Sequence, residues 1–480
     1  MHENNLYKLP PEILRGHQEF KSMNDTSRRQ FLQTAAAAAA STAWLAVEAA
    51  QVSGERPEQD ASVRVVNPRD RVPVSFIIDD STCLVNLAYF AMPQFSETWP
   101  QRKDYQKPWT TWPREIPDSF VRRFGEWCAE RGVRGKYSIV PQPACVGWVD
   151  RELPGWSHRQ LEDSLQLVRE LMLPNWDIHP EMATHTRVID TKTGRPFPER
   201  GPEWMENWQW TDGKSADQLA DYLTYSLQIL KNAGLPCEGI TTPGGFAGKV
   251  VPELAQATLQ SVRHVYGSEI PHYFKFLYTD DRSVLPRVEY ARGLDGNDPE
   301  CVVSIVGCTG DWFGGWDGTE PGSPDQFITA DLNSGRMVEV IEKQEPAIMV
   351  CHWPGMYYNG TEHGFKVFQT VVGRLHQRFD NLHWMKLSQI SRYWAAKELT
   401  TITRTGNDIS FVAPFASPDF TVLLPAAEIT SIRLRHENSD APLHSIPDRL
   451  QLSAGTCCKT DDGWLACFDL PKGRSVLRIE

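Results

Sequence analysis

The chain has 480 residues, of which 41% are apolar, and a formal net charge of −12. This length exceeds that of an ordinary single domain and predicts one large domain followed by a smaller one. The excess of negative charge, with no basic cluster in the body of the chain, argues against a nucleic-acid partner. The 17 Trp, 20 Phe and 13 Tyr predict a globular protein whose rings either fill the core or stack on a substrate.

Residues 1–68 differ in composition from the rest. Arg28 and Arg29 precede an Ala-rich, weakly apolar stretch, an arrangement that resembles a twin-arginine export signal. The apolar stretch is too short and too weak to predict a membrane span. The alternative is an Ala-rich surface helix, and the sequence leaves open whether Met1 or Met23 is the start. We expect residues 1–68 to be an export signal and linker that direct the protein to the periplasm or the cell exterior.

Ten cysteines are spread along the chain without any Cys-x-x-Cys pair. This spacing argues against a structural zinc ribbon and a redox motif. Because export by a twin-arginine route follows folding in the cytoplasm, we expect free, buried thiols.

Residues 69–399 alternate short apolar runs with helical patterns. Expected strands, in chain order, are Val74–Ile78, Arg134–Val140, Asn175–Ile178, Gly239–Thr242, Arg263–Val265, Val302–Val306, Ala347–Cys351 and Leu382–Met385. Expected helices are Asp118–Arg131, His158–Leu173, Ser215–Ala233, Pro252–Gln260, Ser334–Glu345, Gly364–Arg378 and Leu387–Glu398. Seven or eight such repeats predict an α/β fold of the distorted (β/α) barrel type.

Residues 400–480 contain short alternating runs separated by turn residues and no helical pattern. Such a pattern is typical of a small all-β, sandwich-like domain. It carries little chemistry, so we expect a packing or substrate-presentation role in preference to carbohydrate binding.

Two adjacent carboxylates, Asp79 and Asp80, directly follow the first apolar strand of the large domain. Residues just past the carboxyl end of a parallel strand lie at the ligand crevice of α/β folds. Successive side chains point in opposite directions, so the two acids can serve different purposes, one binding a metal and the other handling a proton. The alternative is that they cap a following helix or turn.

A second strand runs into His179, Glu181, His185, Thr186 and, further on, Asp190. Two imidazoles and one carboxylate are enough for a divalent metal site that leaves positions open for water and substrate. Asp80 is a candidate for that carboxylate, although either His can be an ordinary loop residue. By ligand type, the expected metal is Zn²⁺, with Co²⁺ or Mn²⁺ as alternatives.

Three further segments bring candidate residues to strand ends. Pro243 and Phe246 lie on a Gly-rich loop whose amides can hold an oxyanion. Late in the chain, a strand delivers His352, a candidate general acid, together with Trp353. Between them, the loop with Asp311 and Trp312 can cradle a sugar ring or cover the site.

The order of these motifs resembles the polysaccharide deacetylase family, carbohydrate esterase family 4, over residues 70–395. The resemblance implies that Asp79 is the base, that Asp80, His179 and His185 are metal ligands, and that His352 is the general acid. It also implies that the Thr-Pro-Gly-Gly loop stands in place of the family's Arg-Pro-aromatic motif. The chain departs from the family in having Asp-Asp-Ser instead of Asp-Asp-Gly, in lacking the His-Ser/Thr-x-x-His spacing, and in having no Arg before Pro243.

The sequence therefore predicts an exported, metal-dependent hydrolase that removes an acyl group, chiefly acetyl, from a saccharide. Glu181, Thr186, Pro243, Phe246, Asp311, Trp312 and Trp353 are the residues expected to bind substrate. Two alternatives remain open: a catalytically silent carbohydrate-binding protein on the same barrel, and a hydrolase of a non-sugar C–N amide bond. The expected partner is a saccharide or an acylated small molecule, while the sequence does not give the oligomeric state.

Overall fold

The computed structural model describes residues 54–425 and 429–480. The predicted export segment, including Arg28 and Arg29, lies outside the described residues except for its last fifteen. Within the described part, no helix is long and apolar enough to cross a membrane. All ten cysteines are free thiols, and all but Cys145 are buried.

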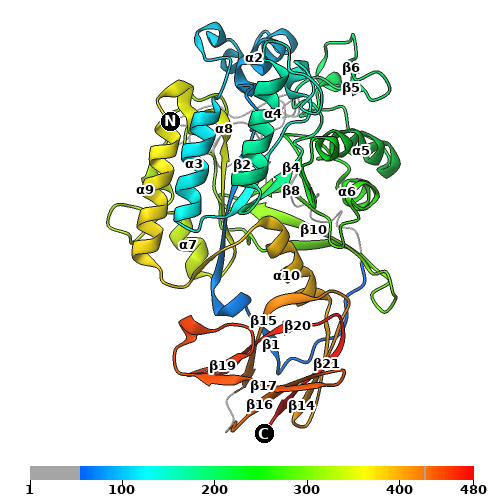
Figure 1. The fold of residues 1–480 in the computed structure, drawn as a ribbon, viewed down its shortest axis with the longest axis vertical. Coiled ribbons are helices and arrows are strands. Elements are labelled where there is room, and N and C mark those ends of the chain that lie inside the picture. Colours follow the sequence, from blue (N-terminus) through cyan, green and yellow to red (C-terminus); the bar gives the residue numbers. More distant parts are fainter. Residues whose placement is uncertain (1–53, 426–428) are drawn as a thin grey trace, which may run out of the picture.

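Parallel strands form the centre of the large α/β part (Figure 1). One sheet has the order β11-β2-β3-β4, with β12 also paired to β2, and all of its pairs are parallel. The second has the order β7-β8-β10-β9, in which only β9 runs antiparallel. The strands are β2 (Val72–Asp79), β3 (Gly135–Ser138), β4 (Trp176–His179), β7 (Gly239–Thr241), β8 (His272–Leu277), β9 (Arg287–Arg292), β10 (Glu300–Gly307), β11 (Ala347–His352) and β12 (Leu382–Trp384).

Single contacts join the facing edges of the two sheets. Glu181, beyond β4, forms a parallel bridge with Thr241 of β7, and the Cys308 amide donates to the Ile348 carbonyl, 2.8 Å away. The predicted α/β class with a parallel sheet is confirmed. The strands do not, however, form one continuous closed barrel, because each seam is held by isolated contacts.

Helices surround these strands (Figure 1). They are α2 (Leu87–Thr98), α3 (Asp118–Glu130), α4 (His158–Leu167), α5 (Ala216–Asn232), α6 (Val251–Tyr266), α7 (Arg336–Glu342), α8 (Trp353–Tyr357), α9 (His363–Arg378) and α10 (Leu387–Leu399). Ser157 and Ser215 cap α4 and α5, each in a capping box with a Gln three residues on.

The expected strand at Arg263–Val265 is wrong, because these residues form the last turns of α6. The helix ends at Gly267, whose φ of 68° suits a left-handed cap. The strands that follow are β8 and β9, which the sequence pattern did not predict. Helix α2 was also missed, since Pro93 lies inside it.

Two short strands, β5 (Ile189–Asp190) and β6 (Arg195–Pro196), pair with each other. The other strands form two five-stranded sheets with the orders β1-β15-β20-β19-β18 and β13-β14-β21-β16-β17. Phe411 of β14 contacts Phe420 and Phe468 of the other sheet at ring-centroid distances of 6.1 and 5.5 Å. These strands are β1 (Arg64–Val65), β13 (Thr401–Thr405), β14 (Asp408–Ala413), β15 (Ser417–Pro425), β16 (Ile432–His436), β17 (Ser439–Pro442), β18 (His444–Ile446), β19 (Thr456–Thr460), β20 (Gly463–Leu470) and β21 (Gly473–Ile479). This C-terminal part is β-rich, and Figure 1 shows α10 between it and the parallel strands.

The register of the parallel strands gathers polar side chains on one face. Lys136 of β3 is opposite Asp177 of β4, and Ser138 is opposite His179. His352 of β11 is opposite Asp79 of β2. Since residues opposite each other in a sheet point to the same side, β4 contributes Asp177 and His179 to one face, and β2 and β11 contribute Asp79 and His352.

Candidate active site

A pocket lies at the carboxyl ends of β2, β4, β7 and β11. Its lining brings together acidic, imidazole and aromatic groups from distant parts of the chain: Asp79, Asp80, Phe95, Tyr105, Glu181, His185, Asn207, Trp208, Thr242, Pro243, Gly244, Trp316 and His352. Of the predicted site residues, Asp79, Asp80, Glu181, His185, Pro243 and His352 meet here. This position follows from the fold, because parallel strands direct the residues at their ends toward one edge.

Asp79 is buried and paired with a buried lysine. Its carboxylate contacts the ammonium of Lys136, which also donates to the Ile78 carbonyl at 3.0 Å and the Ser138 hydroxyl at 2.8 Å. Burial raises the pKa of Asp79 to about 7, while the positive charge of Lys136 acts in the opposite direction. A carboxyl with a pKa near neutrality suits a general base.

Asp80, Glu181 and His185 form a compact group whose candidate ligand atoms all lie within 4.8 Å of one another. His185 Nε2 is 2.8 Å from Asp80 Oδ1 and 3.4 Å from Glu181 Oε1. Glu181 also accepts a hydrogen bond from the Asp80 amide, at 2.7 Å. Both Asp80 and His185 have left-handed backbones, with φ of 60° and 64°. Such conformations are costly for non-glycine residues and persist only where surrounding contacts impose them.

This group requires a positive charge at its centre. Burial alone would lower the pKa of His185, but the carboxylates of Asp80 and Glu181 raise it well above its usual value. Burial likewise opposes ionisation of Glu181, yet the contact with His185 brings its pKa down to about 2. A proton on His185 or a bound cation can supply the charge.

The donor set fits a divalent metal. Two carboxylates and an imidazole are the ligand types that Zn²⁺ and Mn²⁺ accept. Among the described residues, Oδ1 of Asp80 is buried and has no hydrogen-bond partner of good geometry, although the His185 ring lies near it. A buried carboxylate oxygen without a well-formed hydrogen bond is available to bind a metal ion.

Glu206 holds the loop that carries His185. Its buried carboxylate accepts hydrogen bonds from the amides of Thr184, at 3.0 Å, and His185, at 2.6 Å, and it contacts the Tyr222 hydroxyl. Burial raises the pKa of Glu206 to about 7, against the effect of these donors. A ligand fixed in this way is oriented before any cation arrives.

His352 is positioned by Asp311. Oδ2 of Asp311 lies 2.8 Å from His352 Nδ1 and accepts from the His352 amide at 3.2 Å. Burial would lower the pKa of His352, but the negative charges of Asp80, Asp311 and Asp79 raise it to about 9. The imidazole is therefore protonated at neutral pH, as a general acid must be.

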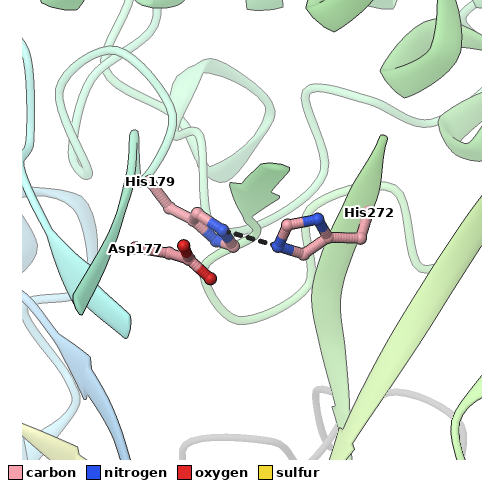
Figure 2. Close-up of side chains that lie close together, drawn as sticks. All are labelled: Asp177, His179 and His272. Carbon is pink, nitrogen blue, oxygen red and sulfur yellow. Dashed lines mark hydrogen bonds between the residues drawn. The ribbon is translucent and has the colours of Figure 1, made fainter. Parts of the chain in front are cut away.

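Several predicted site residues lie elsewhere. His179 is not part of the group of Asp80 and His185, because its Nε2 lies 3.0 Å from His272 Nε2 (Figure 2). Trp353 does not reach the rim, since it is fully buried against Phe120 and Phe124.

Phe246, Thr186 and Trp312 also lie outside the pocket lining. Phe246 is fully buried and Thr186 packs near Cys145, while Trp312 contacts Phe327 at 5.2 Å. Asp311, expected to touch substrate, instead contacts His352.

The loop expected to hold an oxyanion has most of its amides in use. The Thr242 amide donates to Phe274, the Gly245 amide to Asn207 and the Phe246 amide to Pro243. Pro243 itself has no N–H. The expectation of an oxyanion site made by several amides of this loop is therefore wrong.

Sequence reasoning missed Lys136, Glu206 and three rings of the pocket wall, Phe95, Tyr105 and Trp208. The fourth ring, Trp316, lies on the aromatic loop that also carries Asp311 and Trp312. A signal existed for the metal group. Glu181 stands four residues before His185, which is the interval of the His-Ser/Thr-x-x-His motif with Glu in its first position. No comparable signal marked Lys136 or Glu206, since their partners are distant in sequence.

No family model and no curated protein matches the sequence of this chain. Solved structures give weak matches. A protein of Pseudomonas aeruginosa PAO1 described as a probable polysaccharide deacetylase matches at a TM-score of 0.37 and 10% identity, over 68% of this chain and 91% of that one. Puue allantoinase matches at a TM-score of 0.32 and 10% identity, over 72% of this chain and 95% of that one. A mutant CE4 family pseudoenzyme with restored enzymatic activity matches at a TM-score of 0.29 and 11% identity, over 67% of this chain and 68% of that one. TM-scores of this size do not establish a shared fold or function.

Proposed function

We propose that this protein is an exported, metal-dependent hydrolase that removes an acetyl group from a nitrogen or oxygen atom of a saccharide. The observation that carries the proposal is the meeting of Asp79, Asp80, Glu181, His185 and His352 in one pocket. Together they offer a base, a set of three ligands and an acid.

Asp80, Glu181 and His185 would hold the cation. A divalent cation at such a site supplies Lewis acidity, which polarises a carbonyl and lowers the pKa of a water molecule. By ligand type the cation is Zn²⁺, with Mn²⁺ or Co²⁺ as the alternatives.

Asp79 and His352 would move the protons. Asp79, held in place by Lys136, accepts a proton from the attacking water. His352, held by Asp311, donates a proton to the leaving nitrogen or oxygen. Because these two residues lie opposite each other on adjacent strands, they can serve the same reacting bond.

The saccharide assignment is supported by the rings of the pocket wall. Tyr105, Trp208 and Trp316 line the same pocket as the acid and the base. Flat rings with a polar edge suit the apolar faces of a sugar. A non-sugar amide substrate would not need such a wall, although it could occupy it.

Asp80→Asn and His185→Gln test the proposal directly. We expect both variants to lose the bound metal and to release acetate from acetylated sugars at least about 1,000-fold more slowly, because several kcal/mol of transition-state stabilisation are lost. Metal is measured by elemental analysis and acetate by a coupled assay.

Asp221→Asn is the matched control, since Asp221 is an exposed carboxylate on α5. It should keep both metal and activity. Normal acetate release by Asp80→Asn would refute the metal-dependent mechanism. If the wild type binds sugar but contains no metal, the protein is the catalytically silent carbohydrate-binding alternative. If it releases acetate from non-sugar amides alone, it is a hydrolase of non-sugar C–N bonds.

A further inference from the structure

A second group of metal-ligating side chains lies apart from the pocket. Asp177 and His179 come from β4 and His272 from β8 (Figure 2). Their candidate ligand atoms lie within 4.8 Å of one another. Both histidines are fully buried, and none of the three residues lines the active-site pocket.

A glycine allows the two imidazoles to meet. Gly239 of β7 pairs with His272 of β8. On the other side of β7, Thr241 forms a bridge with Glu181. Gly239 lies two residues before Thr241, and His179 lies two residues before Glu181, so Gly239 is also next to His179. Gly239 therefore lies between the two histidines. A Cβ at this position would lie only 2.7 Å from Cδ2 and Nε2 of His272. The absence of a side chain at Gly239 creates the space in which His179 Nε2 approaches His272 Nε2 to 3.0 Å.

Two ring nitrogens of the pair face each other. Nε2 of His179 lies 3.0 Å from Nε2 of His272, and Nδ1 of His179 lies 3.3 Å from the Thr241 hydroxyl. A neutral pair can share one proton between the two Nε2 atoms, and a cation can take the place of that proton when both ring hydrogens are on Nδ1. In the described chain, Nδ1 of His272 has no hydrogen-bond partner of good geometry.

The carboxylate of Asp177 completes the ligand set. It accepts hydrogen bonds from the Ser388 amide at 2.7 Å and the Ser388 hydroxyl at 2.9 Å. Such contacts orient a ligating carboxylate in the same way that an acceptor at Nδ1 orients a ligating imidazole. Two imidazoles and one carboxylate are a common ligand set for Zn²⁺.

We propose that Asp177, His179 and His272 hold a divalent cation of the zinc type, distinct from the one proposed at Asp80, Glu181 and His185. The cation joins β4 of one sheet to β8 of the other across the seam at Gly239. Because none of the three residues lines the pocket and Asp177 also contacts Ser388 of α10, the role of the site is structural.

Elemental analysis of the purified full chain, expressed in zinc-supplemented medium, tests the proposal. We expect two metal ions per chain in the wild type, one in Asp80→Asn, one in His272→Gln and none in the double variant. His264→Gln, which changes an exposed histidine of α6, should retain both. If only the active-site proposal is wrong, the wild type should contain one ion, and His272→Gln should remove that ion. Unchanged metal content in His272→Gln would overturn the second site.

Thr241→Val provides an independent measurement if His272→Gln does not fold. It keeps all three ligands and removes only the hydroxyl beside Nδ1 of His179. Loss of such an outer contact weakens metal binding by about 10- to 100-fold, so the ion should be lost at a correspondingly lower concentration of chelator. Retention equal to that of the wild type would overturn the assignment of the second ion to this group.

Discussion

The pairing of Asp79 with Lys136 shows how a single residue decides the chemistry of the pocket. Both side chains are buried, at 2% and 0% exposure, so each depends on the other for compensation of its charge. A buried ion pair contributes little net stability, but breaking it leaves an uncompensated charge. Lys136 is therefore needed to keep an ionisable Asp79 in the interior.

Lys136→Met should lower the free energy of unfolding by about 3–5 kcal/mol, because it leaves Asp79 buried without a partner. Urea denaturation measures this loss. The double variant Asp79→Asn/Lys136→Met, which removes both charges, should be less destabilised than the sum of the two single variants. A loss below about 1 kcal/mol in Lys136→Met would contradict the pairing.

The contact between His352 and Asp311 predicts the alkaline side of the pH profile. With the pKa of His352 at about 9, kcat/KM should fall above that pH as the imidazole loses the proton it donates. Asp311→Asn removes a negative charge that raises this pKa, so the fall should begin at lower pH. Asp331→Asn, a change at an exposed carboxylate, should leave the profile unchanged. An identical profile in Asp311→Asn would exclude His352 as the acid.

At the level of elements, the loop after β4 is shaped by one buried acid. Met182 and His185 have left-handed backbones, with φ of 52° and 64°, and the Glu206 carboxylate accepts hydrogen bonds from the amides of Thr184 and His185. Without that acceptor, the two buried amides would lack partners. The loop conformation, and with it the direction of the His185 ring, depends on Glu206.

Glu206→Gln should weaken metal retention by about 10- to 100-fold, because an amide NH₂ group replaces one of the acceptor oxygens that face the loop amides. Tyr222→Phe, which removes only the hydroxyl contact with Glu206, should have a smaller effect. Chelator titration followed by elemental analysis measures both. Equal retention in Glu206→Gln and the wild type would show that other contacts hold the loop.

At the scale of the whole molecule, α10 connects the parallel strands to the C-terminal sheets. Tyr393 of α10 donates its hydroxyl to the Val66 carbonyl at 2.6 Å and accepts from the Thr421 amide at 3.2 Å. Strand β1, in the segment expected to be a linker, pairs with β15. Three segments far apart in sequence are thus joined through one hydroxyl.

Tyr393→Phe should lower the free energy of unfolding by about 1–3 kcal/mol, since it leaves a buried amide and a partly buried carbonyl without their partner. Acetate release per folded molecule should not change, because Tyr393 is not part of the pocket. Tyr290→Phe, at a half-buried hydroxyl near Glu300, should cost less than about 0.5 kcal/mol. Equal stability of the two variants would show that the Tyr393 contacts are not important for joining these segments.

The sequence alone determined which residues stand at the ends of strands. The apolar run before Asp79 and Asp80, and the runs before Glu181 and His352, predicted where polar groups would meet, because parallel strands carry the residues at their carboxyl ends to one edge. The change from helical to alternating patterns after residue 399 also predicted the β-rich C-terminal part. These are local properties, which the order of side chains along the chain fixes directly.

Only the tertiary structure decided which of those groups are partners. Strand register places Lys136 beside Asp79, and the missing side chain of Gly239 turns His179 toward His272 and away from Asp80. Glu181, which has no counterpart in the predicted ligand set, contacts the Asp80 amide and the His185 ring, two residues with left-handed backbones. Each outcome depends on contacts between residues far apart in sequence, and shifting one strand by a single position would direct every one of its side chains to the opposite face.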